Sequence, residues 1–213
     1  MKKIACWGRM NPPTKGHGEI IRTAQNLANK WNCEYYLFVT QTETKPIDIK
    51  KAKAELATKK LASQIKESIA GLIRNPFNWE EKVTILKELY GKTGSKYKDL
   101  IISEYSEVNT ITRMLDKMKE LGTTDLEVVL GEDRVDEFEN IFTKYQNATE
   151  VPFDSLKIAP IERFYGISAT KMRLFVLQND RASFINNIDT DNKSLAEEIF
   201  ELLYNKFESF GLL

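Results

Sequence analysis

Gly8-Arg-Met-Asn-Pro-Pro-Thr-Lys-Gly-His17 is the stretch of sequence that decides the fold. The apolar run Lys3-Ile-Ala-Cys-Trp7 precedes it, and apolar residues at helical spacing follow it over residues 20–31, which indicates a strand, a loop and a helix. The two prolines stiffen the loop, and Gly16 lets the backbone approach a ligand closely where the helix begins. Free N–H groups and the positive end of the helix dipole face such a loop, so the stretch predicts a phosphate-binding turn.

Side chains of the same loop also suit an anion. Thr14 supplies a hydroxyl, Arg9 and Lys15 supply cations, and His17 supplies a ring donor. His17 is the only histidine, which excludes a metal site built from several histidines and restricts any Ser-His-Asp arrangement to this residue. The alternative interpretation is a proline-rich turn with a surface histidine. The whole pattern favours the phosphate site, because it falls at a strand–helix junction of the kind where parallel sheets bind ligands.

The rest of the chain alternates strand and helix patterns. Asn78 with Glu81 resembles a capping box at the start of one helix, and Gly122 marks the end of another. This alternation predicts an α/β fold, a Rossmann-like parallel sheet of about five strands flanked by helices. The predicted strands cover residues 3–7, 34–40, 99–103 and 126–130, and the predicted helices cover residues 20–31, 78–90, 111–121 and 195–207.

Residues 48–74 do not fit a minimal fold of this kind. They are rich in lysine and alanine, and their apolar residues from Ile49 to Leu72 approximate one stripe on a long helix. Such a stripe is too apolar to be left bare, so the helix is expected to cover either its own domain or a second subunit. The favoured interpretation is a helix laid on the domain with its lysines in solvent. The predicted organisation is one domain over residues 1–47 and 75–213 with a helical insertion over residues 48–74.

Length and charge restrict the class of protein. The 213 residues suffice for one α/β domain, and 31 basic residues balance 31 acidic ones, so no general attraction to nucleic acid or to a membrane is expected. No apolar run approaches the about 20 residues of a membrane span, and the N-terminus lacks a signal-peptide pattern, so we expect a cytoplasmic protein. Cys6 and Cys33 belong to separate strand-like segments, which predicts reduced thiols rather than a disulfide or a zinc site.

A second candidate motif is Gly166-Ile-Ser-Ala-Thr-Lys-Met-Arg173. Ser168 and Thr170 lie at a predicted helix start, with Lys171 and Arg173 close behind them. Hydroxyl groups and cations at a helix N-terminus suit phosphate. Many capped helices look like this without binding anything, so the motif derives its weight from its pairing with the first one.

The two motifs together resemble those of a known family. Thr14-Lys-Gly-His17 and Ile167-Ser-Ala-Thr-Lys-Met-Arg173 are similar to the (H/T)xGH and ISSTxxR signatures of the nucleotidyltransferase superfamily, which includes nicotinamide-nucleotide, pantetheine-phosphate and glycerol-phosphate nucleotidyltransferases. The form Gly8-Arg-Met-Asn-Pro-Pro-Thr, with Gly131-Glu-Asp-Arg-Val135 and Glu137-Phe138, looks most like the cytidylyltransferase-like proteins of tailed bacteriophages. The resemblance covers roughly residues 1–47 and 75–185 and is specific at the level of the superfamily.

The resemblance implies a Rossmann-like sheet and a direct in-line displacement without a covalent enzyme intermediate. His17, Thr14 and Lys171 would be catalytic, and Thr14 and Lys45 would bind the acceptor. Mg²⁺ would be bound through the substrate phosphates rather than by a cage of protein ligands. The implied nucleotide-binding residues are Gly8, Arg9, Gly16, Gly131, Asp133, Arg134, Ile167, Ser168, Thr170 and Arg173.

Three features depart from the family pattern. Thr14 stands where nicotinamide-nucleotide enzymes of the archaeal type have histidine. Pantetheine-phosphate enzymes have threonine at this position. Glu132 stands where the phage proteins usually have serine. The insertion separates Lys45 from Asn75-Pro76-Phe77, which commonly follow directly.

The implied activity is transfer of a nucleoside monophosphate, with ATP as the favoured donor, to the phosphate of a small acceptor with release of pyrophosphate. Nicotinamide mononucleotide is the favoured acceptor. The alternatives are a cytidylyltransferase, a pantetheine-phosphate adenylyltransferase, and a non-catalytic nucleotide-binding or virion-associated module. A relative of the aminoacyl-tRNA synthetases ranks last, because the chain has no room for a tRNA-binding domain. No nucleic-acid or membrane partner is expected, a homo-oligomer stays open, and the location would be the host cytoplasm if the chain is phage-encoded.

Overall fold

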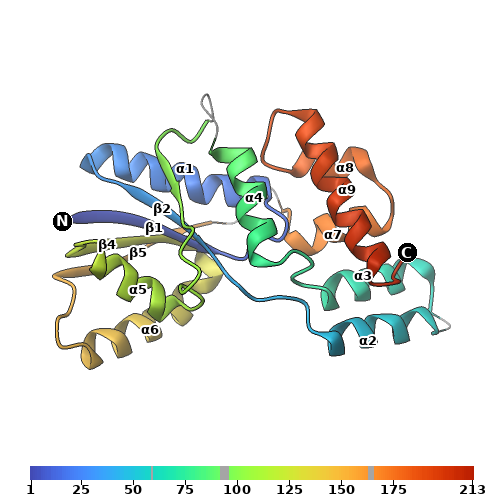
Figure 1. The fold of residues 1–213 in the computed structure, drawn as a ribbon, viewed down its shortest axis with the longest axis horizontal. Helices are drawn as coiled ribbons and strands as arrows, with labels where there is room; N and C mark the ends of the chain where they lie inside the picture. Colours follow the sequence, from blue (N-terminus) through green and yellow to red (C-terminus); the bar gives the residue numbers. More distant parts are fainter. Residues whose placement is uncertain (59, 92–95, 163–165) are drawn as a thin grey trace.

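A five-stranded parallel sheet forms the centre of the fold, in the order β3-β2-β1-β4-β5 (Figure 1). The computed structural model describes residues 1–58, 60–91, 96–162 and 166–213. Cys6 of β1 pairs with Leu37 of β2 on one side and with Val129 of β4 on the other, so β1 lies in the middle of the sheet. Chain order reverses between β1 and β4, and the loop after β1 leaves the carboxyl edge at this switch point. The strands are β1 (Lys2–Gly8), β2 (Tyr35–Val39), β3 (Leu100–Ile102), β4 (Asp125–Gly131) and β5 (Ser155–Ile161).

Helices cover both faces of the sheet, which explains the continuous apolar character of β1. Ile4 and Cys6 are buried in the core that lies on the side of α1 (Lys15–Trp31) and α4 (Trp79–Tyr90). Ala5 and Trp7 are buried in the core on the side of α5 (Ile111–Glu120) and α6 (Val135–Ala148). A short 3-10 helix, η1 (Glu132–Arg134), connects β4 to α6. The predicted α/β class and Rossmann-like parallel sheet are confirmed.

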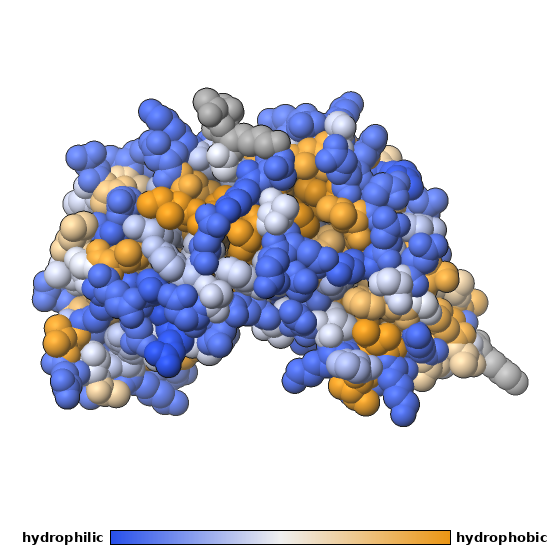
Figure 2. Space-filling view, viewed as in Figure 1, coloured by the Kyte–Doolittle hydropathy of each residue, from blue (hydrophilic) through white to orange (hydrophobic). Residues whose placement is uncertain are grey.

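The remaining helices gather beside the sheet and form a helical lobe (Figure 1). We use this name for α2 (Pro46–Leu56), α3 (Ala62–Leu72), α7 (Ala169–Leu177), α8 (Arg181–Asn187) and α9 (Lys193–Ser209). Seen from the side drawn in Figure 2, the outline of the molecule is notched between the sheet with α5 and α6 and the lobe with α2 and α3.

The predicted single long helix over residues 48–74 is wrong. The segment forms two helices, because α2 ends at its C-cap Ala57 and α3 begins after its N-cap Leu61. A straight helix of this length would extend about 40 Å and would carry much of its apolar stripe away from the domain. Folding back allows Ala52 of α2 and Ile69 and Ala70 of α3 to be fully buried in one core.

The α2–α3 pair covers its own chain, as the favoured interpretation expected. α3 packs on α7 as well as on α2, and Ile73, just after α3, is also fully buried. The two ends of the pair meet, since the backbone N–H of Thr44 donates a 3.0 Å hydrogen bond to the carbonyl oxygen of Asn75. The segment is therefore an insertion whose two ends lie next to each other in the fold.

Most other predicted elements are confirmed with shifts of one or two residues at their ends. The capping box is present, because Asn78 Oδ1 accepts from the Glu81 N–H and the Glu81 carboxylate accepts from the Asn78 N–H. The sequence pattern missed β5, an edge strand that carries Pro160 and in which no residue is fully buried. Cys6 is buried and Cys33 half-buried, and neither is in a disulfide. None of the described helices combines the length and the apolar character that crossing a membrane requires.

Candidate active site

A cavity of about 510 Å³ opens at the carboxyl edge of the sheet, where the two predicted motifs meet. It lies between the ends of β1, β4 and β5, the N-termini of α1 and α7, and the end of α3. Twelve of the predicted site residues line it together, although some are more than 150 positions apart in the chain. They are Gly8, Arg9, Thr14, Gly16, His17, Gly131, Asp133, Arg134, Ile167, Ser168, Thr170 and Arg173.

Two predicted site residues do not line the cavity. Lys45 is the exposed N-cap of α2, and Lys171 is exposed in the first turn of α7, where its backbone N–H donates to Ser168 Oγ at 3.2 Å. Glu132, whose departure from the family pattern was noted above, is exposed and also lies outside the lining. The roles implied for Lys45 and Lys171 stay predictions.

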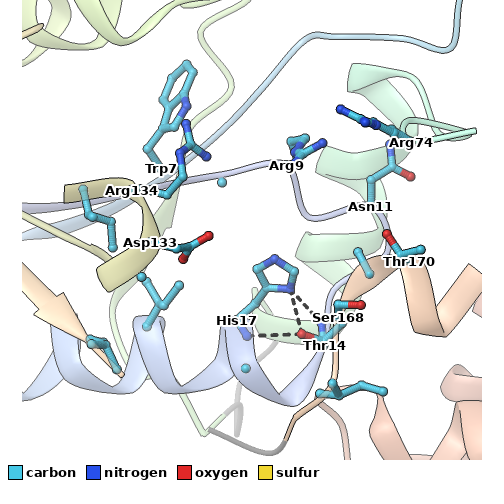
Figure 3. A pocket seen from close by; sticks show the side chains of 18 of the residues that line it. Trp7, Arg9, Asn11, Thr14, His17, Arg74, Asp133, Arg134, Ser168 and Thr170 are labelled. Carbon is cyan, nitrogen blue, oxygen red and sulfur yellow. Dashed lines mark hydrogen bonds between the residues drawn. The ribbon is translucent and has the colours of Figure 1, made fainter. Parts of the chain in front are cut away.

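Thr14 and His17 form the first turn of α1 as a reciprocal cap. Thr14 has extended backbone angles, and its Oγ1 accepts a hydrogen bond of 3.4 Å from the His17 N–H. In return, the Thr14 N–H donates a 3.0 Å hydrogen bond to His17 Nδ1 (Figure 3). Because Nδ1 accepts, the proton of the neutral ring is assigned to Nε2.

The His17 ring is held in its neutral form. Burial lowers its pKa to about 4; the charge of Asp189 acts against this shift, and the charge of Arg9 adds to it. At neutral pH, Nε2–H is therefore a hydrogen-bond donor without a positive charge. A donor of this kind binds phosphate oxygens without taking up a proton.

A second helix N-terminus lies at the same cavity. Ser168 is the N-cap of α7, and the next residues, Ala169 and Thr170, also line the space. The first N–H groups of a helix carry partial positive charge and lack intrahelical acceptors. Two helix starts directed at one cavity form a site for a ligand with several anionic groups.

Arg173, which the resemblance implied as a phosphate ligand, is hydrogen-bonded to the protein itself at the cavity wall. Its side chain is buried, and its Nε and Nη1 donate to the carbonyl oxygens of Ala70 and Asn11 at 3.0 and 2.8 Å. Its Nη2 donates to Thr170 Oγ1 at 2.9 Å. Arg173 thus ties α7 to α3 and to the loop after β1, and its charge is not neutralised by these uncharged partners. Burial, together with the charges of Arg9 and Arg74, lowers its pKa to about 9.

Arg74 is a site residue that the sequence analysis missed. It follows α3 directly, and its Nε donates to the carbonyl oxygen of Gly71 at 3.2 Å, which leaves both Nη groups available to a ligand. No local pattern marks it, because Arg74 reaches the cavity only through the packing of α3 beside α7. The other lining residues that were not predicted are Trp7, Asn11, Ile20, Gly71, Leu130, Phe138, Ile161, Glu162 and Ala169.

The loop after β1 is fixed from behind. Asn11 is fully buried, its Nδ2 donates to the carbonyl oxygen of Phe77 at 3.0 Å, and its Oδ1 accepts from the Phe77 N–H at 3.2 Å. This pair of bonds joins the loop after β1 to the segment that follows Arg74. These bonds thereby fix the position of Arg74 relative to the start of α1.

Positive charge is in excess in the cavity wall, where four arginines and two carboxylates lie. Among residues 1–58, 60–91, 96–162 and 166–213, no carboxylate lies within ion-pair distance of Arg9, Arg74 or Arg173, whereas Arg134 pairs with Glu137 at 2.6 Å. Burial and the charges of Arg134 and Arg74 lower the pKa of Arg9. Three unpaired guanidinium groups around one space favour an anionic ligand.

Figure 3 shows the arrangement around the cavity. The guanidinium groups of Arg9, Arg74 and Arg134 occupy the upper part of the view. The capped start of α1, with Thr14 and His17, lies in the lower part. An anion between them would contact cations on one side and helix N–H groups on the other.

Apolar side chains form another part of the wall. Most of them belong to the ends of β4 and β5 and to the segments that follow them, and they suit a flat ring better than a phosphate. The two carboxylates in the lining are Asp133 and Glu162. Within the described part of the chain, no three His, Cys, Asp or Glu side chains are grouped as they would be in a protein metal site. The apolar residues are Leu130, Phe138, Ile161, Ile167 and Ala169, with Trp7 from the end of β1 and Ile20 from α1.

Comparison with known proteins places the fold. No protein-family model matches the sequence, and no curated protein matches it. A solved structure from Vibrio parahaemolyticus, assigned as a nicotinate-nucleotide adenylyltransferase, is similar with a TM-score of 0.53 and 19% identity over 95% of this chain and 99% of that one. The nicotinic acid mononucleotide adenylyltransferase of Plasmodium falciparum complexed with APC gives a TM-score of 0.40 and 12% identity over 100% of this chain and 97% of that one. The Vibrio structure shows that this fold is shared over nearly the full length of both chains.

Proposed function

We propose that this chain is a nucleotidyltransferase that transfers AMP from ATP to the phosphate of a small acceptor and releases pyrophosphate. The observation that carries the proposal is the single cavity that joins a neutral His17 ring, two helix N-termini and three unpaired arginines. Such a cavity suits a ligand with several phosphate groups, and its apolar wall suits a base. The paired motifs described above resemble those of enzymes that use such a ligand.

The reaction requires no protein nucleophile. An oxygen of the acceptor phosphate attacks the α-phosphorus of ATP, a new P–O–P bond forms, and the bond to the β-phosphate oxygen breaks, so that pyrophosphate leaves with the electron pair. Catalysis of this step depends on positioning and on stabilising negative charge. His17 Nε2–H donates a hydrogen bond to the nucleotide phosphates as negative charge develops on the leaving pyrophosphate. The neutral ring keeps this proton at neutral pH, so it stays a donor throughout the reaction.

The other lining residues divide between the two substrates. Thr14, at the start of α1, holds the attacking phosphate, while Ser168 and Thr170 at the start of α7 face the leaving phosphates. Arg9 and Arg74 are free to pair with phosphate oxygens, whereas Arg173 holds α7 in place and adds its charge from behind. Gly131 and Asp133 lie at the end of β4, next to the apolar wall that suits the base.

The site fits a magnesium ion that is bound through the phosphates rather than by a protein cage. Asp133 and Glu162 are carboxylates in the lining, and the described residues offer no closed set of ligands around them. Mg²⁺ would supply neutralisation of the negative charge on the phosphates. The protein's own part is to orient these phosphates against the two helix N-termini.

A pyridine mononucleotide is the proposed acceptor, with nicotinamide mononucleotide first and its nicotinate counterpart second. The motifs support it at the level of the superfamily, and the Vibrio structure that shares the fold is assigned to nicotinate-nucleotide adenylyl transfer. The test is pyrophosphate release from ATP and CTP against a panel of phosphorylated acceptors. ATP-dependent release with a mononucleotide acceptor is the expected result, and nucleotide binding without release for any acceptor would indicate a non-catalytic module.

A further inference from the structure

Asp189 is a buried carboxylate close to the phosphate-binding end of α1. It lies between α8 and α9, and only 3% of its surface is exposed. Its Oδ2 accepts hydrogen bonds from the hydroxyl groups of Tyr97 at 2.7 Å and Tyr90 at 3.2 Å, and its Oδ1 pairs with Lys96. The carboxylate does not line the cavity, so the chemistry described above leaves this buried group unexplained.

The carboxylate lies against the helix residue that follows His17. A Cβ atom added to Gly18 would be 2.2 Å from Asp189 Oδ2 and 2.4 Å from its Cγ, so only glycine fits here. Glycine inside a helix costs about 1 kcal/mol relative to alanine. Glycine at position 18 therefore lowers the helix propensity of the first turn of α1, and it allows direct contact between this turn and Asp189.

Tyr97 connects the same two residues. Its hydroxyl lies 2.7 Å from Asp189 Oδ2 and 2.9 Å from the carbonyl oxygen of Gly18. The hydroxyl has one proton, so it donates to one of these two acceptors at a time. Burial and the charge of Asp189 raise the pKa of Tyr97, which keeps this hydroxyl protonated as a donor. The Tyr90 and Tyr97 rings pack edge to face with centroids 5.0 Å apart, so both hydroxyl groups are held toward the carboxylate.

The cluster of Asp189, Tyr97 and Tyr90 thus supports the first turn of α1 on the side away from the cavity. Thr14 holds the same turn from its start through the cap with His17. A carboxylate near a helix N-terminus is favoured by the helix dipole. The charged groups that act on the His17 ring are Asp189, from the α8–α9 connection, and Arg9, from the loop after β1, and their effects on its pKa are opposite.

We infer that Asp189 is a positioning residue of the active site, which acts through Gly18 and Tyr97 to hold the first turn of α1 and the His17 ring in place. The inference rests on the proposed function for its kinetic consequence. It also assigns a role to the C-terminal part of the chain, because the connection between α8 and α9 brings the carboxylate to the site. Nothing in the paired motifs indicates this role.

Asp189→Asn is the first test, since it keeps the shape of the side chain and removes its charge. We expect kcat to fall about tenfold with KM for ATP within about twofold, because a small misplacement of His17 affects the transition state more than binding. NMR gives an independent readout, because His17 is the only histidine and its ring signals are unambiguous. Loss of the negative charge is expected to lower the pKa of His17 and to shift its ring signals.

Tyr97→Phe is the second variant, and it keeps the ring packing while it removes the hydroxyl. It is expected to lower kcat in the same direction, and combining it with Asp189→Asn is expected to add less than the product of the two effects. Tyr145→Phe is the matched control, because it removes a 2.9 Å hydrogen bond to Asp116 on the opposite side of the sheet. It should leave both kcat and the His17 signals unchanged.

The inference is overturned if Asp189→Asn and Tyr97→Phe lose stability but keep the kcat and the His17 signals of the wild type. If Asp189→Asn fails to fold, Tyr97→Phe alone decides between these outcomes. Absence of any transferase activity in the wild type would contradict the proposed function instead. The NMR comparison would still show whether Asp189 controls the His17 ring.

Discussion

The backbone N–H of Thr14 donates a 3.0 Å hydrogen bond to Nδ1 of His17, three residues further along the first turn of α1. This bond assigns the remaining proton of the neutral ring to Nε2, and burial keeps the ring neutral by lowering its pKa to about 4. The hydrogen bond that caps the helix therefore also fixes the tautomer in which His17 Nε2–H is a donor. In the proposed reaction, this donor stabilises the negative charge that develops on the leaving pyrophosphate.

His17→Ala is expected to lower kcat by about a hundredfold or more, because it removes one donor to the transition state. Thr14 keeps its hydroxyl as a helix cap in this variant, so the fold should survive. Steady-state kinetics and a far-UV circular dichroism spectrum test the two parts. Turnover equal to that of the wild type would end the catalytic role of His17.

The pH dependence of stability should reveal the depressed pKa of His17. The folded-state pKa is about 4 and the unfolded value is about 6.5, so between these values the unfolded chain binds more protons. Stability contributed by the neutral ring is fully present above about pH 6.5 and decreases as the pH falls toward 4. Urea denaturation of the wild type and His17→Ala at pH 7.5 and 5 measures this difference, and an NMR titration midpoint near 6.5 would contradict it.

Arg74→Ala is expected to raise KM for ATP or for the acceptor at least about tenfold, because it removes a charge-assisted hydrogen bond to phosphate. Lys45→Ala is the informative comparison, since the sequence predicts that Lys45, like Thr14, binds the acceptor, but Lys45 does not line the cavity. We expect the larger effect from Arg74. A larger effect from Lys45 would support the acceptor-binding role that the sequence predicts for it.

Arg173→Met should destabilise the protein by about 2–4 kcal/mol, because the carbonyl oxygens of Ala70 and Asn11 would lose their donor. Chemical denaturation measures the change. Arg181→Met is the matched control, since it removes an exposed ion pair with Glu201 on the surface and should cost less than about 1 kcal/mol. Equal stability losses in the two variants would contradict the structural role of Arg173.

Removal of the α2–α3 pair tests whether the insertion belongs to the site. Joining Lys45 to Asn75 through a short flexible linker is geometrically reasonable, because Thr44 and Asn75 are already hydrogen-bonded. We expect a folded sheet with weaker ATP binding, since Gly71 and Arg74 are lost from the lining and the Ala70 acceptor of Arg173 disappears. Intact ATP affinity and turnover would show that the segment only decorates the surface.

Local patterns explain which elements were predictable. The β1–α1 junction could be predicted because its apolar strand, prolines and capping residues lie within about thirty consecutive positions, and the α7 start has the same local character. The edge strand β5 lacks a continuous apolar run, so its pattern does not separate it from a loop. The turn between α2 and α3 was missed because no glycine or proline marks it, and burial of both helices in one core decides it.

The sequence alone determined the class of fold, the two capped helix starts and most of the residues that line the cavity, because caps and apolar periodicity are short-range properties of the chain. Only the tertiary structure decided that Arg74 enters the site, that Arg173 is a buried support, and that Asp189 lies on Gly18. Each of these depends on contacts between segments that are far apart in sequence. Such contacts are set by which surfaces pack together, and no local pattern of residues encodes that choice.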